Sequence, residues 1–151
     1  MAIIDDLHTD EFHAIASRLV KHLNNVIIVS RVAHWTVRGQ DFYQYHLLYE
    51  RVYNELGELL DTMIEQLRAL GHNPTFQELS GPGIDVPSYD TQTLTELTLD
   101  YLMAAQAVFT TAFEYSEEAD DARMYGFGDF LQGGLQTMLQ VQYLLGSAMG
   151  H

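Results

Sequence analysis

The stretch GHNPTFQELSGPGIDVPSYD, residues 71–90, decides the fold of this chain. It holds all three prolines of the sequence and separates two regions with long helical patterns. A connection of this length is unusual inside a compact domain, so we predict that it runs along the length of a helical bundle. Within it, TFQELS (residues 75–80) is predicted to form a short helix.

Two long helical patterns precede this connection and two follow it, with no alternation long enough to indicate a strand. The helices are expected at about 9–38, 41–70, 91–119 and 121–149. Thr9 and Asp41 are good caps for the first two helices, and Gly39 and Gly71 are expected to end them. Two helices, a long crossover and two more helices predict an all-α, ferritin-like four-helix bundle.

The last helical pattern is rich in glycine, with Gly126, Gly128, Gly133 and Gly134. Each glycine inside a helix costs about 1 kcal/mol relative to alanine. Two explanations remain open: irregular first turns, or close packing of this helix against another chain.

Length and composition indicate one globular domain over residues 1–151, with a formal net charge of -14. Such an acidic surface repels nucleic acid and attracts cations. The absence of cysteine excludes disulfides and thiolate metal sites. The apolar runs are too short to cross a membrane, and MAIIDDLHTDEF does not resemble a secretory signal, so a cytoplasmic protein is expected.

Candidate metal ligands gather in the second helical segment, residues 41–70: His46, Glu50, Asp61 and Glu65. The first two are four residues apart, as are the last two, so each pair shares a helix face. Imidazole and carboxylate together suit divalent iron, zinc or manganese. An ordinary solvated acidic face is the alternative interpretation of Asp61 and Glu65.

Helix geometry separates these ligands. His46 and Asp61 are fifteen residues apart, which at ~1.5 Å per residue is roughly 22 Å, so they cannot hold the same ion within one chain. Two antiparallel copies of this helix, related by a two-fold axis near Tyr53 and Asn54, would create two equivalent sites. His34, across the Gly39 corner, could then join His46.

The motif H-W-x3-G-x2-F-x3-H, followed by E at +4 and D-x3-E at +15, resembles that of the Dps family of mini-ferritins. The matching residues are His34, Trp35, Gly39, Phe42, His46, Asp61 and Glu65. The resemblance implies a hollow dodecamer built of dimers. It also implies a ferroxidase that oxidises Fe(II) with hydrogen peroxide or oxygen, stores the ferric mineral and protects against oxidative damage. No Glu-x-x-His pair of the kind found in ferritin bundle cores occurs here.

The resemblance also implies the roles of individual residues. His34 and His46 would come from one chain, and Asp61 and Glu65 from its partner, to form a di-iron or mono-iron site at the dimer interface. Glu50, where the family usually has Asp, would be a further metal ligand.

Two residues beside this motif have roles only by resemblance. Trp35 would be an aromatic electron donor beside the metal, and packing at the dimer interface is its alternative. Arg31, where relatives often carry Lys, would pair with an interfacial carboxylate.

A second acidic cluster lies where the third and fourth helices meet: Glu117, Glu118, Asp120 and Asp121. In the Dps family an acidic pore near the start of the last helix admits iron, which these residues would form around a three-fold axis. The alternative is a solvated turn in which Asp120 and Asp121 only cap a helix.

Dps proteins that bind DNA often do so through basic tails, and this chain has none. Its first residues include Asp5, Asp6, Asp10 and Glu11. DNA binding is therefore expected to be weak or absent. Two other functions remain open: a non-enzymatic nucleoid protein that protects DNA within the same cage, and a structural bundle without metal.

Overall fold

A computed structural model describes residues 9–151 of the protein, so Asp5 and Asp6 lie outside the described residues. The helices are α2 (Asp10–Thr36), α3 (Phe42–Ala69), α4 (Thr91–Glu118) and α5 (Ala122–Ala148). Over residues 9–151 the chain contains no strand. The predicted all-α four-helix bundle is confirmed.

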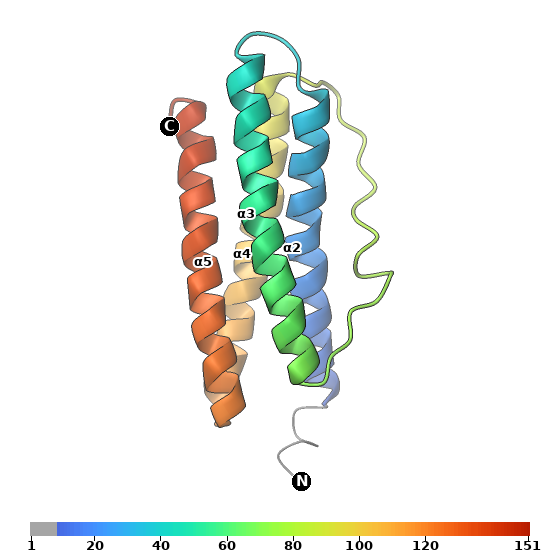
Figure 1. The fold of residues 1–151 in the computed structure, drawn as a ribbon, viewed down its shortest axis with the longest axis vertical. Helices are drawn as coiled ribbons and strands as arrows, with labels where there is room; N and C mark the ends of the chain where they lie inside the picture. Colours follow the sequence, from blue (N-terminus) through green and yellow to red (C-terminus); the bar gives the residue numbers. More distant parts are fainter. Residues whose placement is uncertain (1–8) are drawn as a thin grey trace.

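The four helices pack in a ring in which α2 contacts α3 and α4, and α5 contacts α3 and α4. Residues 71–90 run along the outside of the bundle from the end of α3 to the start of α4 (Figure 1). This crossover makes α3 and α4 point in the same direction, so that every pair of neighbours in the ring is antiparallel. The edge formed by α2 and α3 therefore lies opposite the edge formed by α4 and α5.

Side chains cap the starts of α2 and α4, at the predicted cap Thr9 and at Asp90, which was not among the predicted caps. Thr9 Oγ1 accepts a hydrogen bond from the Phe12 amide at 3.1 Å, and Asp90 Oδ1 accepts one from the Thr93 amide at 2.8 Å. Each such cap contributes about 1 kcal/mol. Gly39 and Gly71 have φ values of +103° and +106°, a backbone region that glycine adopts without strain.

The prediction that the Asp41 side chain caps α3 is wrong. Asp41 occupies the N-cap position with φ 64°, and its side chain makes no capping hydrogen bond. With Gly39 also in the left-handed region, the corner between α2 and α3 is too tight for the usual extended N-cap backbone.

The short helix predicted at residues 75–80 is reduced to one turn. The Leu79 amide donates to the Thr75 carbonyl and the Ser80 amide to the Gln77 carbonyl, both at 3.3 Å. A segment this short cannot offset the cost of helix nucleation, and Gly81 follows it directly. The turn is held to the bundle because Asn24 Nδ2 donates to the Leu79 carbonyl at 3.1 Å.

The core is formed by the inward apolar faces of all four helices, and Tyr49 is its largest fully buried side chain. Tyr49 Oη lies 2.7 Å from Thr95 Oγ1, so this contact joins α3 to α4. Burial disfavours the phenolate and raises the pKa of Tyr49 to about 12. Across the described range, none of the helices is both apolar enough and long enough to span a membrane.

The glycines of α5 divide into two kinds. A methyl group on Gly134 would lie 2.6 Å from Phe109 Cε2, and one on Gly128 would lie 2.8 Å from Ser116 Oγ. These two glycines let α4 approach α5 closely within one chain. Gly126 and Gly133 face open space. Because α5 is helical from Ala122 onward, the explanation by irregular first turns is wrong.

Gly134→Ala should lower the free energy of unfolding by about 1–3 kcal/mol, because the new methyl group overpacks against the buried Phe109 ring. Gly133→Ala is the matched control and should raise the same free energy by up to about 1 kcal/mol through helix propensity. Urea unfolding of both variants measures the difference. Equal effects of the two substitutions would contradict the packing role of Gly134.

Candidate metal centre

The corner at residues 37–41 brings two histidines from different helices into contact. His34 lies in the last turn of α2, and His46 lies five positions into α3. Their rings stack with centroids 3.8 Å apart and planes inclined by 14°. His34 is buried and His46 is half-buried. Two imidazoles twelve residues apart in the sequence are therefore side by side, an arrangement that the Gly39 corner was expected to allow.

The two histidines also fix each other's tautomer. His34 Nδ1 lies 2.7 Å from the His46 carbonyl oxygen, and His46 Nδ1 lies 2.7 Å from the His34 carbonyl oxygen. A carbonyl oxygen only accepts hydrogen bonds, so each Nδ1 must carry the proton. In the neutral form, each Nε2 then has its lone pair available to bind a metal ion.

Aromatic side chains support this pair on both sides. The Phe42 ring stacks on His46 with centroids 5.1 Å apart, and the Tyr53 ring meets His34 edge-on at 5.4 Å. The Arg31 guanidinium lies over the Tyr53 ring at 4.9 Å. The contact of Tyr53 with His34 was not predicted from the sequence, although Tyr53 lies two turns after His46 on the same face of α3.

Trp35 and Arg31 both remain accessible from solvent in the single chain. Trp35 is 68% exposed and follows His34 directly. The predicted electron-donor role of Trp35 and the predicted ion pair of Arg31 with a partner carboxylate both stay predictions, since each depends on a second chain.

The candidate carboxylates lie on α3 away from the histidine pair. Glu50 is one turn after His46 and half-buried, whereas Asp61 and Glu65 are exposed. Because α3 is helical from Phe42 to Ala69, the ~1.5 Å rise places Asp61 roughly 22 Å along the axis from His46. With 3.6 residues per turn, all four side chains still fall within a stripe about 100° wide. Over residues 9–151, no three His, Asp or Glu side chains are grouped so that they could hold one ion.

Exposed apolar side chains surround the histidine corner on α2 and α3. They are Val32, Trp35, Phe42, Tyr43 and Leu47. A patch of large apolar residues of this kind marks an interaction surface.

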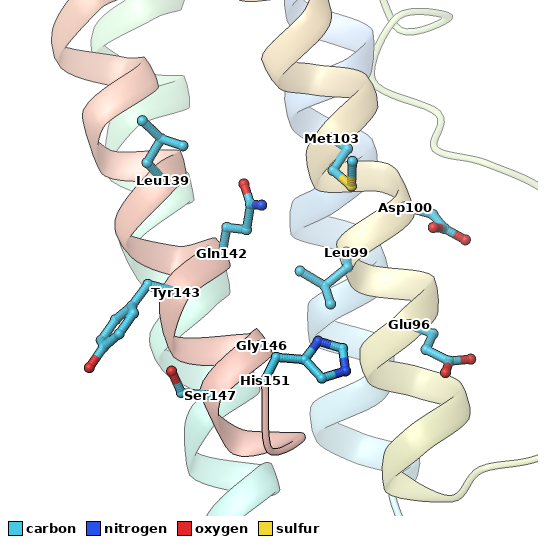
Figure 2. A pocket seen from close by; sticks show the side chains of 10 residues that line it. All are labelled: Glu96, Leu99, Asp100, Met103, Leu139, Gln142, Tyr143, Gly146, Ser147 and His151. Carbon is cyan, nitrogen blue, oxygen red and sulfur yellow. The ribbon is translucent and has the colours of Figure 1, made fainter.

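A second apolar surface lies on the opposite edge of the bundle. A groove of about 580 Å³ runs between α4 and α5, with Leu99 and Met103 on one side and Leu139 and Tyr143 on the other (Figure 2). Met103, Leu139 and Tyr143 are each more than half exposed in the single chain.

The acidic cluster between α4 and α5 contains two engaged and two free carboxylates. Asp121 caps α5 through the Arg123 amide and pairs with the Arg123 guanidinium, and these hydrogen bonds lower the pKa of Asp121. Asp120 accepts a hydrogen bond from Tyr125 Oη at 2.7 Å. Glu117 and Glu118 are exposed in the last turn of α4. Capping therefore accounts for Asp121. Of the four carboxylates, only those of Glu117 and Glu118 make no hydrogen bond or ion pair within the described part of the chain.

Comparison with known proteins gives a family assignment for most of the chain. The ferritin-like domain model matches residues 14–146. DNA protection during starvation protein 1 of Deinococcus radiodurans is 25% identical over 154 aligned positions, which cover 95% of this chain and 72% of that protein. The DNA protection during starvation protein of Listeria innocua is 32% identical over 74 residues, and this match spans only 46% of the Listeria protein.

Solved structures show the same fold. The Dps protein of Vibrio cholerae O1, described as a member of a superfamily of ferritin-like diiron-carboxylate proteins, superposes with a TM-score of 0.81 at 16% identity, covering 98% of this chain and 91% of that one. Dps from Microbacterium arborescens superposes with a TM-score of 0.80 at 18% identity, covering 99% and 95% of the two chains. The chain therefore belongs to the ferritin-like family, and within it to the Dps-type mini-ferritins.

Proposed function

We propose that this protein is a ferroxidase whose metal sites form only between two chains, within a dodecameric cage that stores the ferric product. Family membership supports an iron-storage or DNA-protecting cage. The observation that supports the ferroxidase proposal is the reciprocal hydrogen bonding of His34 and His46, which leaves the Nε2 lone pair of each neutral ring available to a metal ion.

The missing ligands would come from the partner chain. Two antiparallel α3 helices, packed through the stripe that holds His46, Glu50, Asp61 and Glu65, would bring each histidine pair level with the partner's carboxylates. The exposed apolar side chains around the corner would be covered in the same dimer. Ferrous iron would then be held as substrate by neutral imidazole and carboxylate, a ligand set that suits Fe(II) and stabilises Fe(III).

The chemistry is an electron transfer from iron to peroxide. Two ferrous ions each give up one electron, and the O–O bond of hydrogen peroxide breaks and takes up two protons to yield two water molecules. Removing iron and peroxide together prevents the formation of hydroxyl radicals. Trp35, next to His34, would supply an electron when a strongly oxidising intermediate is left unreduced.

The second apolar surface supports an assembly larger than a dimer. The α4–α5 groove lies on the edge opposite α2 and α3, so a two-fold contact through α3 leaves it uncovered. Contacts through both surfaces would build a closed cage from dimers.

Co-assembly of two inactive variants tests the shared site directly. In a mixed dimer of His46→Ala and Asp61→Ala/Glu65→Ala chains, one site combines both defects and the other combines intact histidines with intact carboxylates. Peroxide-driven iron oxidation should therefore be abolished in each pure variant. In a random mixture it should recover to about one quarter of the wild-type rate, because about half of the dimers are mixed and each holds one intact site of two.

Stopped-flow absorbance of ferric iron measures these rates. A mixture as inactive as the pure variants would show that the ligands do not come from two chains. A wild-type rate in the pure Asp61→Ala/Glu65→Ala variant would show that the metal site lies elsewhere.

Iron entry through the acidic cluster is tested by Glu117→Gln/Glu118→Gln. Loss of these exposed carboxylates should slow iron uptake several-fold, since they would concentrate cations at the pore. Glu11→Gln, exposed in the first turn of α2, is the control. The particle mass from light scattering should be unchanged in both variants. Uptake at the wild-type rate by the double variant would remove the pore assignment, with Asp120 and Asp121 left to capping and Tyr125 binding.

DNA binding should be weak or absent at physiological salt, because a chain with net charge -14 gains little from counterion release. An electrophoretic mobility shift with duplex DNA at about 150 mM salt checks this expectation. A shift with micromolar or tighter affinity under these conditions would instead favour the DNA-protecting function.

A further inference from the structure

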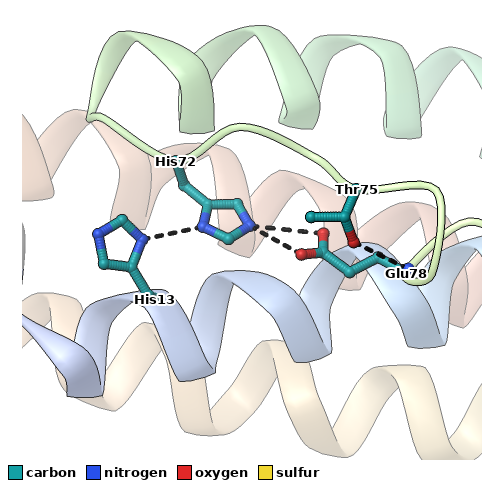
Figure 3. Close-up of polar contacts among 4 residues, drawn as sticks. All are labelled: His13, His72, Thr75 and Glu78. Carbon is teal, nitrogen blue, oxygen red and sulfur yellow. Dashed lines mark hydrogen bonds and ion pairs between the residues drawn. The ribbon is translucent and has the colours of Figure 1, made fainter.

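A cluster of three buried or half-buried side chains lies at the other end of α2, far from the His34–His46 corner (Figure 3). His13, in the first turn of α2, faces His72, which follows the end of α3, and their Nδ1 atoms are 3.0 Å apart. On the far side of the His72 ring, Nε2 lies 3.2 Å from Glu78 Oε1 and 3.4 Å from Oε2. The crossover turn positions Glu78, whose amide donates to Thr75 Oγ1.

The carboxylate decides which nitrogen of His72 is free. Glu78 accepts the proton of Nε2–H, so the neutral His72 ring presents an Nδ1 lone pair to His13. A carboxylate on the outer nitrogen of a histidine is the arrangement that orients metal-binding imidazoles in proteins. The Nδ1 atom of His13 completes a pair of nitrogens that converge on one point.

Charge balance also favours a cation at this point. His72 is 7% exposed and Glu78 is 8% exposed, and His72 is the only ion-pair partner of Glu78 in the described part of the chain. A buried carboxylate is unfavourable in a protein interior unless a positive charge lies beside it, and a metal ion on the His72 ring would supply that charge. His13 is half-buried, so water can reach the outer side of the pair.

We propose that His13 and His72 bind a divalent transition-metal cation between their Nδ1 atoms, with zinc the best match. Imidazole nitrogens suit zinc, and two tetrahedral Zn–N bonds of about 2.0–2.1 Å place the nitrogens about 3.3–3.4 Å apart. The observed 3.0 Å needs to widen by only a few tenths of an ångström. Water completes the coordination on the His13 side, and Glu78 holds the His72 ring. The bound ion would fasten the crossover to the start of α2, independently of the iron site.

Zinc binding to the assembled full-length protein tests the proposal. Metal-free protein is titrated with zinc near neutral pH, and bound ions per chain are counted by equilibrium dialysis. His13→Gln, at a half-buried position, should lose about one zinc ion per chain. The same variant should lose the part of the zinc-induced rise in Tm that this site produces. His72→Gln should lose the same ion, and His22→Gln, on the same helix but outside the cluster, should keep it.

The Asp61→Ala/Glu65→Ala variant separates this site from the proposed iron site. It should retain the zinc ion that His13→Gln removes, and His13→Gln should oxidise iron at the wild-type rate. A wild-type zinc count and an unchanged zinc-induced Tm shift in His13→Gln would overturn the proposal and leave the pair sharing a proton. That outcome would not touch the iron site, whose failure would appear only in the co-assembly experiment.

Discussion

The fixed rise of an α-helix is the constraint on which the site depends. Because α3 is helical from Phe42 to Ala69, its two pairs of candidate ligands are held on one stripe but about four turns apart. No side-chain movement can bring Asp61 to His46 within one chain. In an antiparallel copy of α3 the same two pairs occur in the opposite order along the axis. Each histidine would then lie level with the partner's carboxylates, and two sites would be completed at once. A shorter or kinked α3 would be incompatible with both proposed sites.

The histidine pair is organised by backbone as much as by side chains. Each ring donates a hydrogen bond to the backbone carbonyl oxygen of the other histidine. Neither ring can turn without losing this hydrogen bond. Both carbonyls belong to the ends of helices that meet at the Gly39 corner. Correct joining of α2 to α3 therefore also sets the tautomers and positions of these two candidate ligands.

The bundle and the histidine pair were predictable because both depend on spacing. Apolar periodicity and the proline-rich crossover led to four helices in the observed order. The Gly39 corner between two helices indicated that His34 could join His46, and their rings stack. The predictions of an Asp41 side-chain cap and of a short helix at 75–80 were wrong. In both segments the packing around a short stretch of chain decides its backbone conformation. The His13–His72–Glu78 cluster escaped prediction because its members come from α2 and the crossover, which no sequence period connects.

Two contacts show that the crossover does more than join α3 to α4. At its far end the Tyr89 carbonyl accepts a hydrogen bond from the Arg38 amide at 2.9 Å, and the Arg38 guanidinium lies 5.5 Å from the centre of the Tyr89 ring. Arg38 immediately precedes Gly39, so the crossover braces the corner that positions the histidine pair. Its near end is held by Glu78 and His72 against the start of α2. The crossover thus contacts both clusters, one at each of its ends.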